Sequence, residues 1–184
     1  MTKQSILKGL IPMEPLSWEQ VFAFWRENEG DDSHWGLHAR SRGFPEWAAW
    51  RMSYASALRL PERAWRCCRV RDPYALVPTF RGGPYRTWKE QFYGDDPHPT
   101  FAQIARHPGI WTHEGVLSIA GKFPEETTII GLICDSGIVI IEGMHRCTAI
   151  AFATAACVRI AHDLTIALAD ARGETLPIIG QSVP

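Results

Sequence analysis

IVIIEGMHRCTAI, at residues 138–150, is the stretch of this chain that decides its expected fold. Its first four residues are apolar and β-branched, which is typical of a buried strand. The run stops at Glu142-Gly143, and small and apolar residues then recur at helical spacing. The stretch therefore predicts a strand, a tight turn and a helix, with His145 and Arg146 on the first helical turn.

The start of this helix is suited to an anion. The first N–H groups of a helix have no partner within it, and the helix dipole is positive at that end. Phosphate groups bind at such positions, and His145 and Arg146 offer further charge or hydrogen bonds. A structural interpretation stays open beside this one, in which the pair caps the helix and Glu142 forms an ion pair with Arg146.

Composition excludes some classes of protein. The 184 residues are 46% hydrophobic and 21% charged, as in ordinary globular proteins. Because 19 basic residues balance 20 acidic ones, the net charge of −1 provides no general attraction to nucleic acid or an anionic membrane. Arginines crowd between residues 59 and 86, so nucleic acid stays open as a partner, although solvated arginines are the simpler explanation.

The expected location is the cytoplasm. No apolar run approaches the roughly 20 residues that cross a bilayer, and residues 1–15 lack the apolar segment of a signal peptide. The five cysteines form no CxxC pair, which is simplest to explain by reduced thiols. We therefore expect a soluble protein with no membrane partner.

Residues 1–62 are expected to form a helical, Trp-rich extension. Ser17 and Gln20 have the spacing of a capping box at a helix start. A second helix follows Pro45, and its aromatic residues share one face. We expect an arm before Ser17 and a loop between the helices. Six of the eight Trp precede residue 66, and a packing surface is a simpler explanation for them than a ligand platform.

Residues 63–170 are expected to form a second unit, and residues 171–184 a loosely held tail. The predicted elements are a strand at 64–72, helices from Thr100 and Thr112, strands at 127–134 and 138–142, a helix from Gly143 and a strand at 158–168. The two central strands form a hairpin around Asp135-Ser136-Gly137. The order predicts an α/β (α+β) fold with a small mixed sheet and a helical N-terminal extension.

A hairpin whose second strand runs into Gly-x-His-Arg at the start of an Ala-rich helix resembles the ParB/sulfiredoxin-like superfamily. The resemblance covers about residues 64–168. It implies a fold that binds a nucleotide, here ATP or ADP with Mg²⁺. It places the phosphates at the turn, on the five residues Gly143, Met144, His145, Arg146 and Thr148.

Three branches of this superfamily differ at the turn. Sulfiredoxins carry a reactive Cys where this chain has Met144, and Cys147 lies in the helix, so the resemblance argues against sulfiredoxin activity. Partition proteins carry Gly-Glu-Arg-Arg and bind CTP, which the Met-His pair here does not match. The closest branch includes free-serine kinases with Asp-Gly-x-His-Arg, in which Glu142 would stand for the Asp.

The residue types at the turn fit phosphoryl transfer. Arg146 offers a fork for two phosphate oxygens, and His145 can donate to phosphate or exchange a proton near neutral pH. Glu142 can polarise an acceptor hydroxyl or hold Mg²⁺ through water. Glu142 and His145 are therefore the expected catalytic residues. No protein metal ligands are assigned, because the spaced histidine pairs lack a third ligand.

The predicted function is that of an ATP- or ADP-dependent phosphotransferase acting on an unknown small-molecule acceptor. The general base of the kinases comes from an earlier segment that cannot be aligned here, so catalysis itself stays open. The alternative is a non-catalytic module that senses a nucleotide, or that binds a protein or DNA through its Trp-rich half.

Overall fold

A five-stranded sheet forms the centre of the computed structural model, which describes residues 7–30, 34–161 and 163–180. Its order is β1-β2-β5-β3-β4. The pair β3 and β5 is parallel, and the other neighbours are antiparallel. The strands are β1 (Leu10–Leu16), β2 (Trp65–Val70), β3 (Glu126–Cys134), β4 (Gly137–Glu142) and β5 (Asp163–Asp170). This is the mixed α+β architecture that the sequence predicts.

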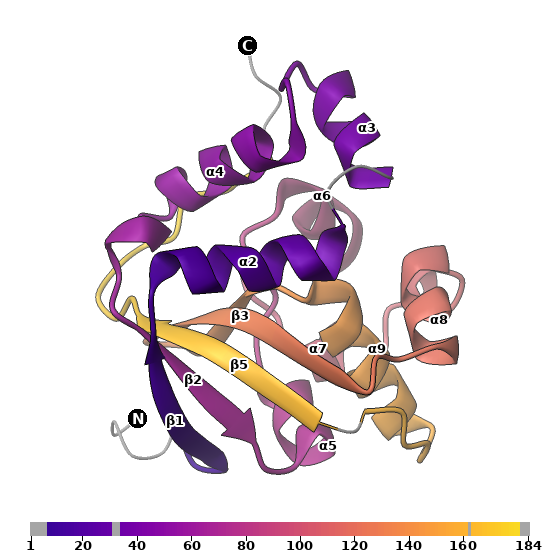
Figure 1. The fold of residues 1–184 in the computed structure, drawn as a ribbon. Helices are drawn as coiled ribbons and strands as arrows, with labels where there is room; N and C mark the ends of the chain where they lie inside the picture. The colour runs from indigo at the N-terminus through magenta and orange to yellow at the C-terminus, as the bar shows by residue number, and fades with distance from the viewer. Residues whose placement is uncertain (1–6, 31–33, 162, 181–184) are drawn as a thin grey trace.

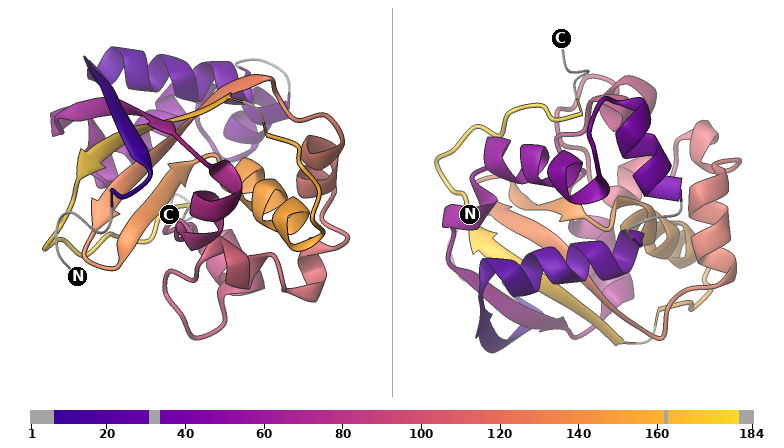
Figure 2. Two further views of the ribbon diagram at one scale, coloured as in Figure 1. Left: turned by 90° about the horizontal axis from the view of Figure 1, so that it is seen from below. Right: turned by 45° about the horizontal axis from the view of Figure 1, so that its top comes forward.

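Helices cover both faces of the sheet (Figures 1 and 2). On one face lie α2 (Trp18–Glu29) and α4 (Trp47–Ala57), with α3 (His34–Ser41) beside α4. The other face is covered mainly by α5 (Pro73–Leu76), η2 (Val77–Thr79), α7 (Phe101–Ile104) and α9 (Met144–Ala155). The remaining elements are η1 (Leu60–Glu62), α6 (Arg86–Trp88), η3 (Lys89–Tyr93), η4 (Pro108–Ile110) and α8 (Glu114–Gly121).

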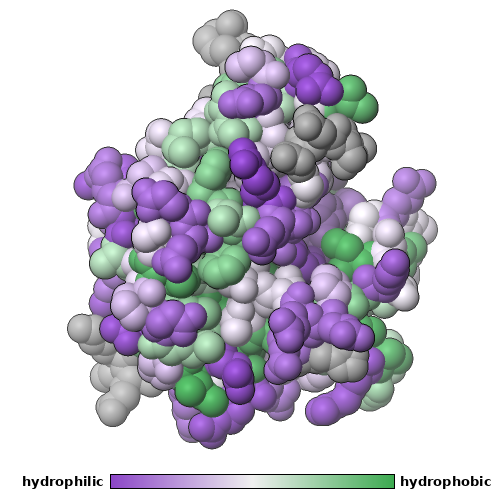
Figure 3. Space-filling model, in the orientation of Figure 1, coloured by the Kyte–Doolittle hydropathy of each residue, from purple (hydrophilic) through white to green (hydrophobic). Residues whose placement is uncertain are grey.

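Because helices cover both faces of the sheet, β4 contains an apolar run. Successive side chains of a strand point to opposite faces of the sheet. Ile138 and Ile140 therefore enter the core beneath α9, whereas Val139 and Ile141 enter the core beneath α2 and α4. A strand buried on both faces has no polar alternation. The outer surface over α2 carries hydrophilic side chains next to apolar ones (Figure 3).

Several local signals are confirmed. Ser17 and Gln20 form the predicted capping box of α2, and Thr100 and Gln103 form one at α7. The β3–β4 hairpin closes with Cys134 opposite Gly137. Each of these features depends on residues close together in the sequence.

Other expectations are wrong. The segment expected to be an arm contains β1, and part of the expected loop before Pro45 is α3. Short helices occupy much of the chain between β2 and α7, where the sequence predicts no element. α8 begins at Glu114, with His113 as its N-cap, instead of at Thr112, and β5 begins at Asp163 instead of residue 158. Among the described residues, no helix has the length and apolar character that crossing a membrane would require.

The expected loose tail is held in place over residues 171–180. Ile179 is buried, and its backbone bonds to both sides of the loop at Pro84–Arg86. Glu174 forms an ion pair with Arg63 at 2.7 Å. This segment joins the core shared by α2, α4 and the sheet.

Substitution in this segment tests its contribution to stability. Ile179→Ala should lower the free energy of unfolding by about 2–4 kcal/mol, because it opens a cavity in the core. Ile178 is 43% exposed, so Ile178→Ala should change stability by no more than about 0.5 kcal/mol. Urea denaturation of both variants gives the comparison. Equal effects would contradict the packing of Ile179.

Candidate functional site

The predicted strand–turn–helix is present at the Glu142 turn. β4 ends at Glu142, Gly143 takes the left-handed conformation with φ +100°, and α9 begins at Met144. No side chain of the described residues caps the N-terminus of α9. The early N–H groups of this helix thus keep the character expected of an anion site.

Gly143 is required by packing as well as by its backbone conformation. A Cβ atom at this position would lie 2.5 Å from Cγ2 of Ile129 on β3. The side of Gly143 that lacks a side chain therefore faces the sheet. At Gly143 the backbone therefore approaches a neighbouring strand closely.

Glu142 and Arg146 form a buried ion pair. Their exposed fractions are 5% and 7%, and Nη2 of Arg146 donates to Oε1 of Glu142. Nη1 of Arg146 donates to Oγ1 of Thr127 at 2.8 Å. The pairing that the sequence left open as a structural role is therefore observed, and the guanidinium is directed at the protein.

Asn28 of α2 completes the hydrogen bonding of this pair. Its Nδ2 donates to Oε2 of Glu142 at 2.8 Å and to the carbonyl oxygen of Thr128 at 2.7 Å. Its Oδ1 accepts a long hydrogen bond from the hydroxyl of Thr127 at 3.4 Å. No local pattern in the sequence points to Asn28, because its partner Glu142 lies 114 residues away.

Glu29, next to Asn28, lies in a second buried cluster. Arg51 of α4 binds both of its carboxylate oxygens, each at 2.7 Å. The indole N–H groups of Trp25 and Trp47 also donate to Glu29. The guanidinium of Arg51 lies 3.7 Å from the ring centre of Trp50, a cation–π distance. The tryptophans thus form a packing surface, the simpler of the two roles expected for them.

The carboxyl group of Glu142 has an unusual environment. Burial raises its pKa from 4.5 to about 7, although Arg146 and the hydrogen bond from Asn28 favour the charged form. The negative charge of Glu29 raises the pKa further, while Arg51 lowers it. A carboxyl group with a pKa near neutrality is suited to accept and release protons.

His145 lies in a cluster of rings and is half-buried. Its ring centre is 5.2 Å from that of His113 and 5.3 Å from that of Trp88. Burial lowers the pKa of His145 to about 4, helped by His113 and Arg146. His145 is therefore neutral at pH 7 and offers a hydrogen bond rather than positive charge.

Met144 and Thr148 make internal contacts. The Met144 sulfur accepts the N–H of Gly83 at 3.3 Å. Thr148 is fully buried, and its hydroxyl donates to the carbonyl oxygen of Met144 at 2.8 Å. The hydroxyl of Thr148 is thus directed at its own helix, in contrast to the phosphate contact expected from the sequence.

Metal ligands are not grouped in the described part of the chain. No set of three or more His, Cys, Asp or Glu there is arranged to hold a metal ion. Both carboxylate oxygens of Glu142 already accept hydrogen bonds. The turn therefore provides no ready set of protein ligands for Mg²⁺.

Comparison with protein-family models, with curated proteins and with solved structures finds no match for this chain. The resemblance to the ParB/sulfiredoxin-like superfamily accordingly depends on the turn motif and the order of elements around it.

Two alanine substitutions separate the effect of the contact at Gly143 on stability from the effect of its left-handed backbone conformation. Gly143→Ala should lower the free energy of unfolding by about 3 kcal/mol, because the new Cβ meets Ile129 and the left-handed conformation disfavours alanine. Gly43 has φ +83° and open space around its Cβ position, so Gly43→Ala should lose only about 1 kcal/mol. Chemical denaturation measures both variants. Equal losses would rule out the contact with Ile129.

The pKa of Glu142 predicts a pH dependence of stability. Between pH 4.5 and about 7 the native carboxyl keeps a proton that the unfolded chain releases. The native state therefore binds more protons, and its stability falls as pH rises through this range, by about 3 kcal/mol from this group.

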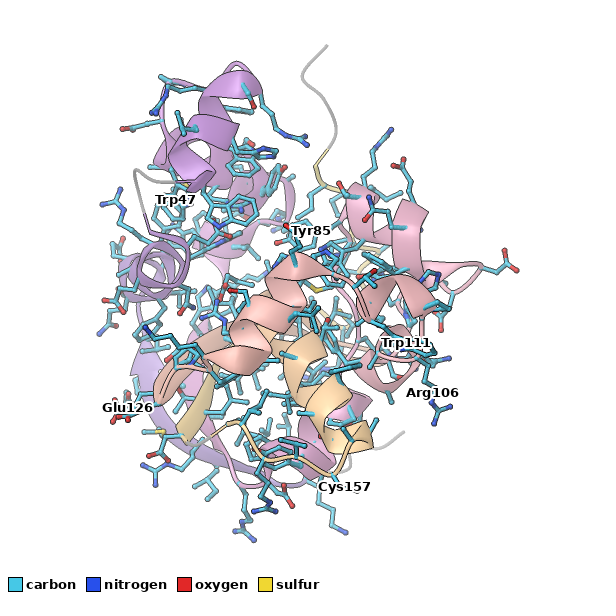
Figure 4. The ribbon with its side chains drawn as sticks, turned by 90° about the vertical axis from the view of Figure 1, so that its right-hand side faces the viewer. Trp47, Tyr85, Arg106, Trp111, Glu126 and Cys157 are labelled. Atoms are coloured by element: carbon cyan, nitrogen blue, oxygen red, sulfur yellow. The ribbon has the colours of Figure 1, made fainter. Side chains whose placement is uncertain are left out.

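Removing the titrating group tests this prediction. Glu142→Gln should flatten the dependence of unfolding free energy on pH between 4.5 and 7. Glu126→Gln is the control, since Glu126 is exposed at the start of β3 (Figure 4). The prediction fails if the wild type and Glu142→Gln show the same slope.

Proposed function

We propose that the chain binds ATP or ADP with its phosphates at the Gly143–Arg146 turn and transfers a phosphoryl group to a small-molecule acceptor. One observation carries the proposal: a buried carboxyl group with a pKa near 7 lies beside a guanidinium at the uncapped start of α9. The order of elements around the turn and its motif support the same reaction class.

The phosphate would be bound mainly by backbone and neutral donors. The N–H groups of Met144, His145 and Arg146 belong to the first turn of α9, where the helix dipole favours an anion. Neutral His145 can donate one ring N–H. Arg146 is held by Glu142 and Thr127, so its guanidinium would not bind the phosphate directly. Thr148 has no part in this arrangement.

Glu142 would act as the proton acceptor. In phosphoryl transfer a positioned base takes the proton of the attacking hydroxyl, and a pKa of about 7 keeps a large fraction of the carboxyl ionised at neutral pH. Asn28 would fix the orientation of this carboxyl through its hydrogen bond to Oε2. Mg²⁺ bound to ATP would neutralise phosphate charge, and the proposal assigns it no protein ligand.

The second candidate is a nucleotide-binding module without catalysis. It is favoured by the internal hydrogen bonds of Arg146 and Thr148, which leave fewer side chains to contact a transferred phosphoryl group. In this case the turn would sense a nucleotide, and Glu142 would stabilise the fold.

Calorimetric titration with ADP, and with ATP plus Mg²⁺, tests the binding step. His145→Ala should weaken nucleotide binding by about tenfold, the effect of losing one well-placed hydrogen bond. Lys122→Ala, which changes an exposed cation beyond α8, should bind as the wild type does. Absence of binding to the folded wild type would refute both candidates.

Turnover separates the two candidates. Release of ADP from ATP should be measured over a panel of small hydroxyl-bearing acceptors. Glu142→Gln should bind ATP at least as tightly as the wild type, because it removes a negative charge near the phosphates, yet lose at least about a hundredfold in rate, as expected for loss of a general base. Binding without turnover across the panel would favour the non-catalytic module.

A further inference from the structure

A hollow of about 410 Å³ lies in a part of the chain that the Glu142 turn does not use. It is lined by η3, by the loop that leads to α7, and by α7 and η4. Its size is within the range of small-molecule pockets, about 300–1,000 Å³. The η3 segment is a five-residue π-helix, a rare form that is frequent at functional sites.

Two polar side chains that line the hollow keep N–H donors that make no hydrogen bond within it. Oε1 of Gln103 already accepts the N–H and the hydroxyl of Thr100, at 2.7 and 2.8 Å, so its NH₂ group remains. Nδ1 of His107 accepts the N–H of Gly109 at 3.1 Å, so the neutral ring carries its proton on Nε2. Both side chains can therefore donate to a ligand.

The charged side chains of the hollow also favour an anion. Arg106 is exposed and extends from the rim, on the side of the molecule that also carries Trp111 (Figure 4). The single carboxylate in the lining is that of Asp96. Its Oδ1 accepts the N–H of His98 at 2.9 Å, and its Oδ2 lies 4.0 Å from Arg81. Asp96 is thus partly engaged by residues outside the hollow, and Arg106, His107 and Gln103 are the groups of the lining that an anion can bind.

An aromatic wall stands beside these donors. Phe92 lies in the lining and is half-buried, with its ring centre 5.4 Å from that of His107. Pro99 and Pro108 add apolar surface. A flat ring can pack against such a wall while an acidic group on it reaches the donors.

We propose that this hollow binds a small organic anion, namely a planar ring that carries a carboxylate or a phosphate monoester. The acidic group binds Arg106, His107 and Gln103, and the ring packs against Phe92. This site is distinct from the Glu142 turn and does not depend on the function proposed for it.

The position of Phe92 gives the site a second readout. The ring of Phe92 also lies 5.7 Å from that of His113, which in turn contacts His145. An aromatic ligand beside Phe92 should therefore shift the NMR signals of the His113 ring through ring-current effects, even in the absence of nucleotide.

Titration followed by ¹H–¹⁵N NMR tests the proposal, with benzoate and phenyl phosphate as probes and benzylamine as a cation of matched shape. Both acids should give saturable shifts at residues 92–96 and 103–109 and at the His113 ring, and benzylamine should not. Arg106→Gln should weaken benzoate binding by about fivefold or more, and Lys122→Gln should leave it unchanged. Gln103→Glu, which places an acid among the donors, should abolish it.

Three results would overturn the proposal. These are no saturable shift with either acid, equal binding of benzylamine, and unchanged binding in both Arg106→Gln and Gln103→Glu. The first two use the wild-type protein, so they hold whether or not a variant folds. Loss of nucleotide binding at the turn would not affect the result, because the titrations contain no nucleotide.

Discussion

Burial of the sheet on both faces is the constraint on which the rest of the structure depends. It makes the end of β4 a nearly buried position, so the carboxyl group of Glu142 needs hydrogen bonds from the protein. Arg146 and Asn28 meet this requirement from α9 and α2. Removing one member of such a pair costs about 3–5 kcal/mol because it leaves a buried charge without a partner. Burial also raises the pKa of Glu142, so one cause produces both the rigidity and the unusual chemistry of the turn.

The Trp-rich segment is part of this arrangement. Trp25 and Trp47 share a core with Ile130 and Ile141 of the sheet, and their indole groups hold Glu29 against Arg51. This second ion pair fixes the C-terminal end of α2, where Asn28 reaches Glu142. The two units expected from the sequence, residues 1–62 and 63–170, thus meet at one buried polar network. The hydrogen bonding of Glu142 depends on the N-terminal helices as much as on its own hairpin.

Local signals in the sequence were enough to predict α2, α7, the β3–β4 hairpin and the start of α9, because caps and turns depend on residues a few positions apart. β1 was not predicted, because Pro12 and Pro15 disfavour a strand. The structure accommodates them because β1 is an edge strand whose register shifts between these two residues. The pairing of Glu142 with Arg146 was foreseen from their spacing, as one of two interpretations. The contact of Asn28 with Glu142 and the neutral state of His145 depend on packing between distant segments, so no local pattern shows them.

The electrostatics of the turn link anion binding to protonation. Glu142 and Arg146 together carry almost no net charge while the carboxyl is ionised, and His145 adds none at neutral pH. A phosphate at the start of α9 would therefore meet N–H groups and the helix dipole on one side and a nearby carboxylate on the other. Its negative charge would raise the pKa of Glu142 above about 7 and favour uptake of a proton. By linkage, a protonated Glu142 would bind the phosphate more tightly. In the proposed reaction this coupling has a direction: the carboxyl that takes the proton of the acceptor becomes a better neighbour for the phosphate charge as the transfer proceeds.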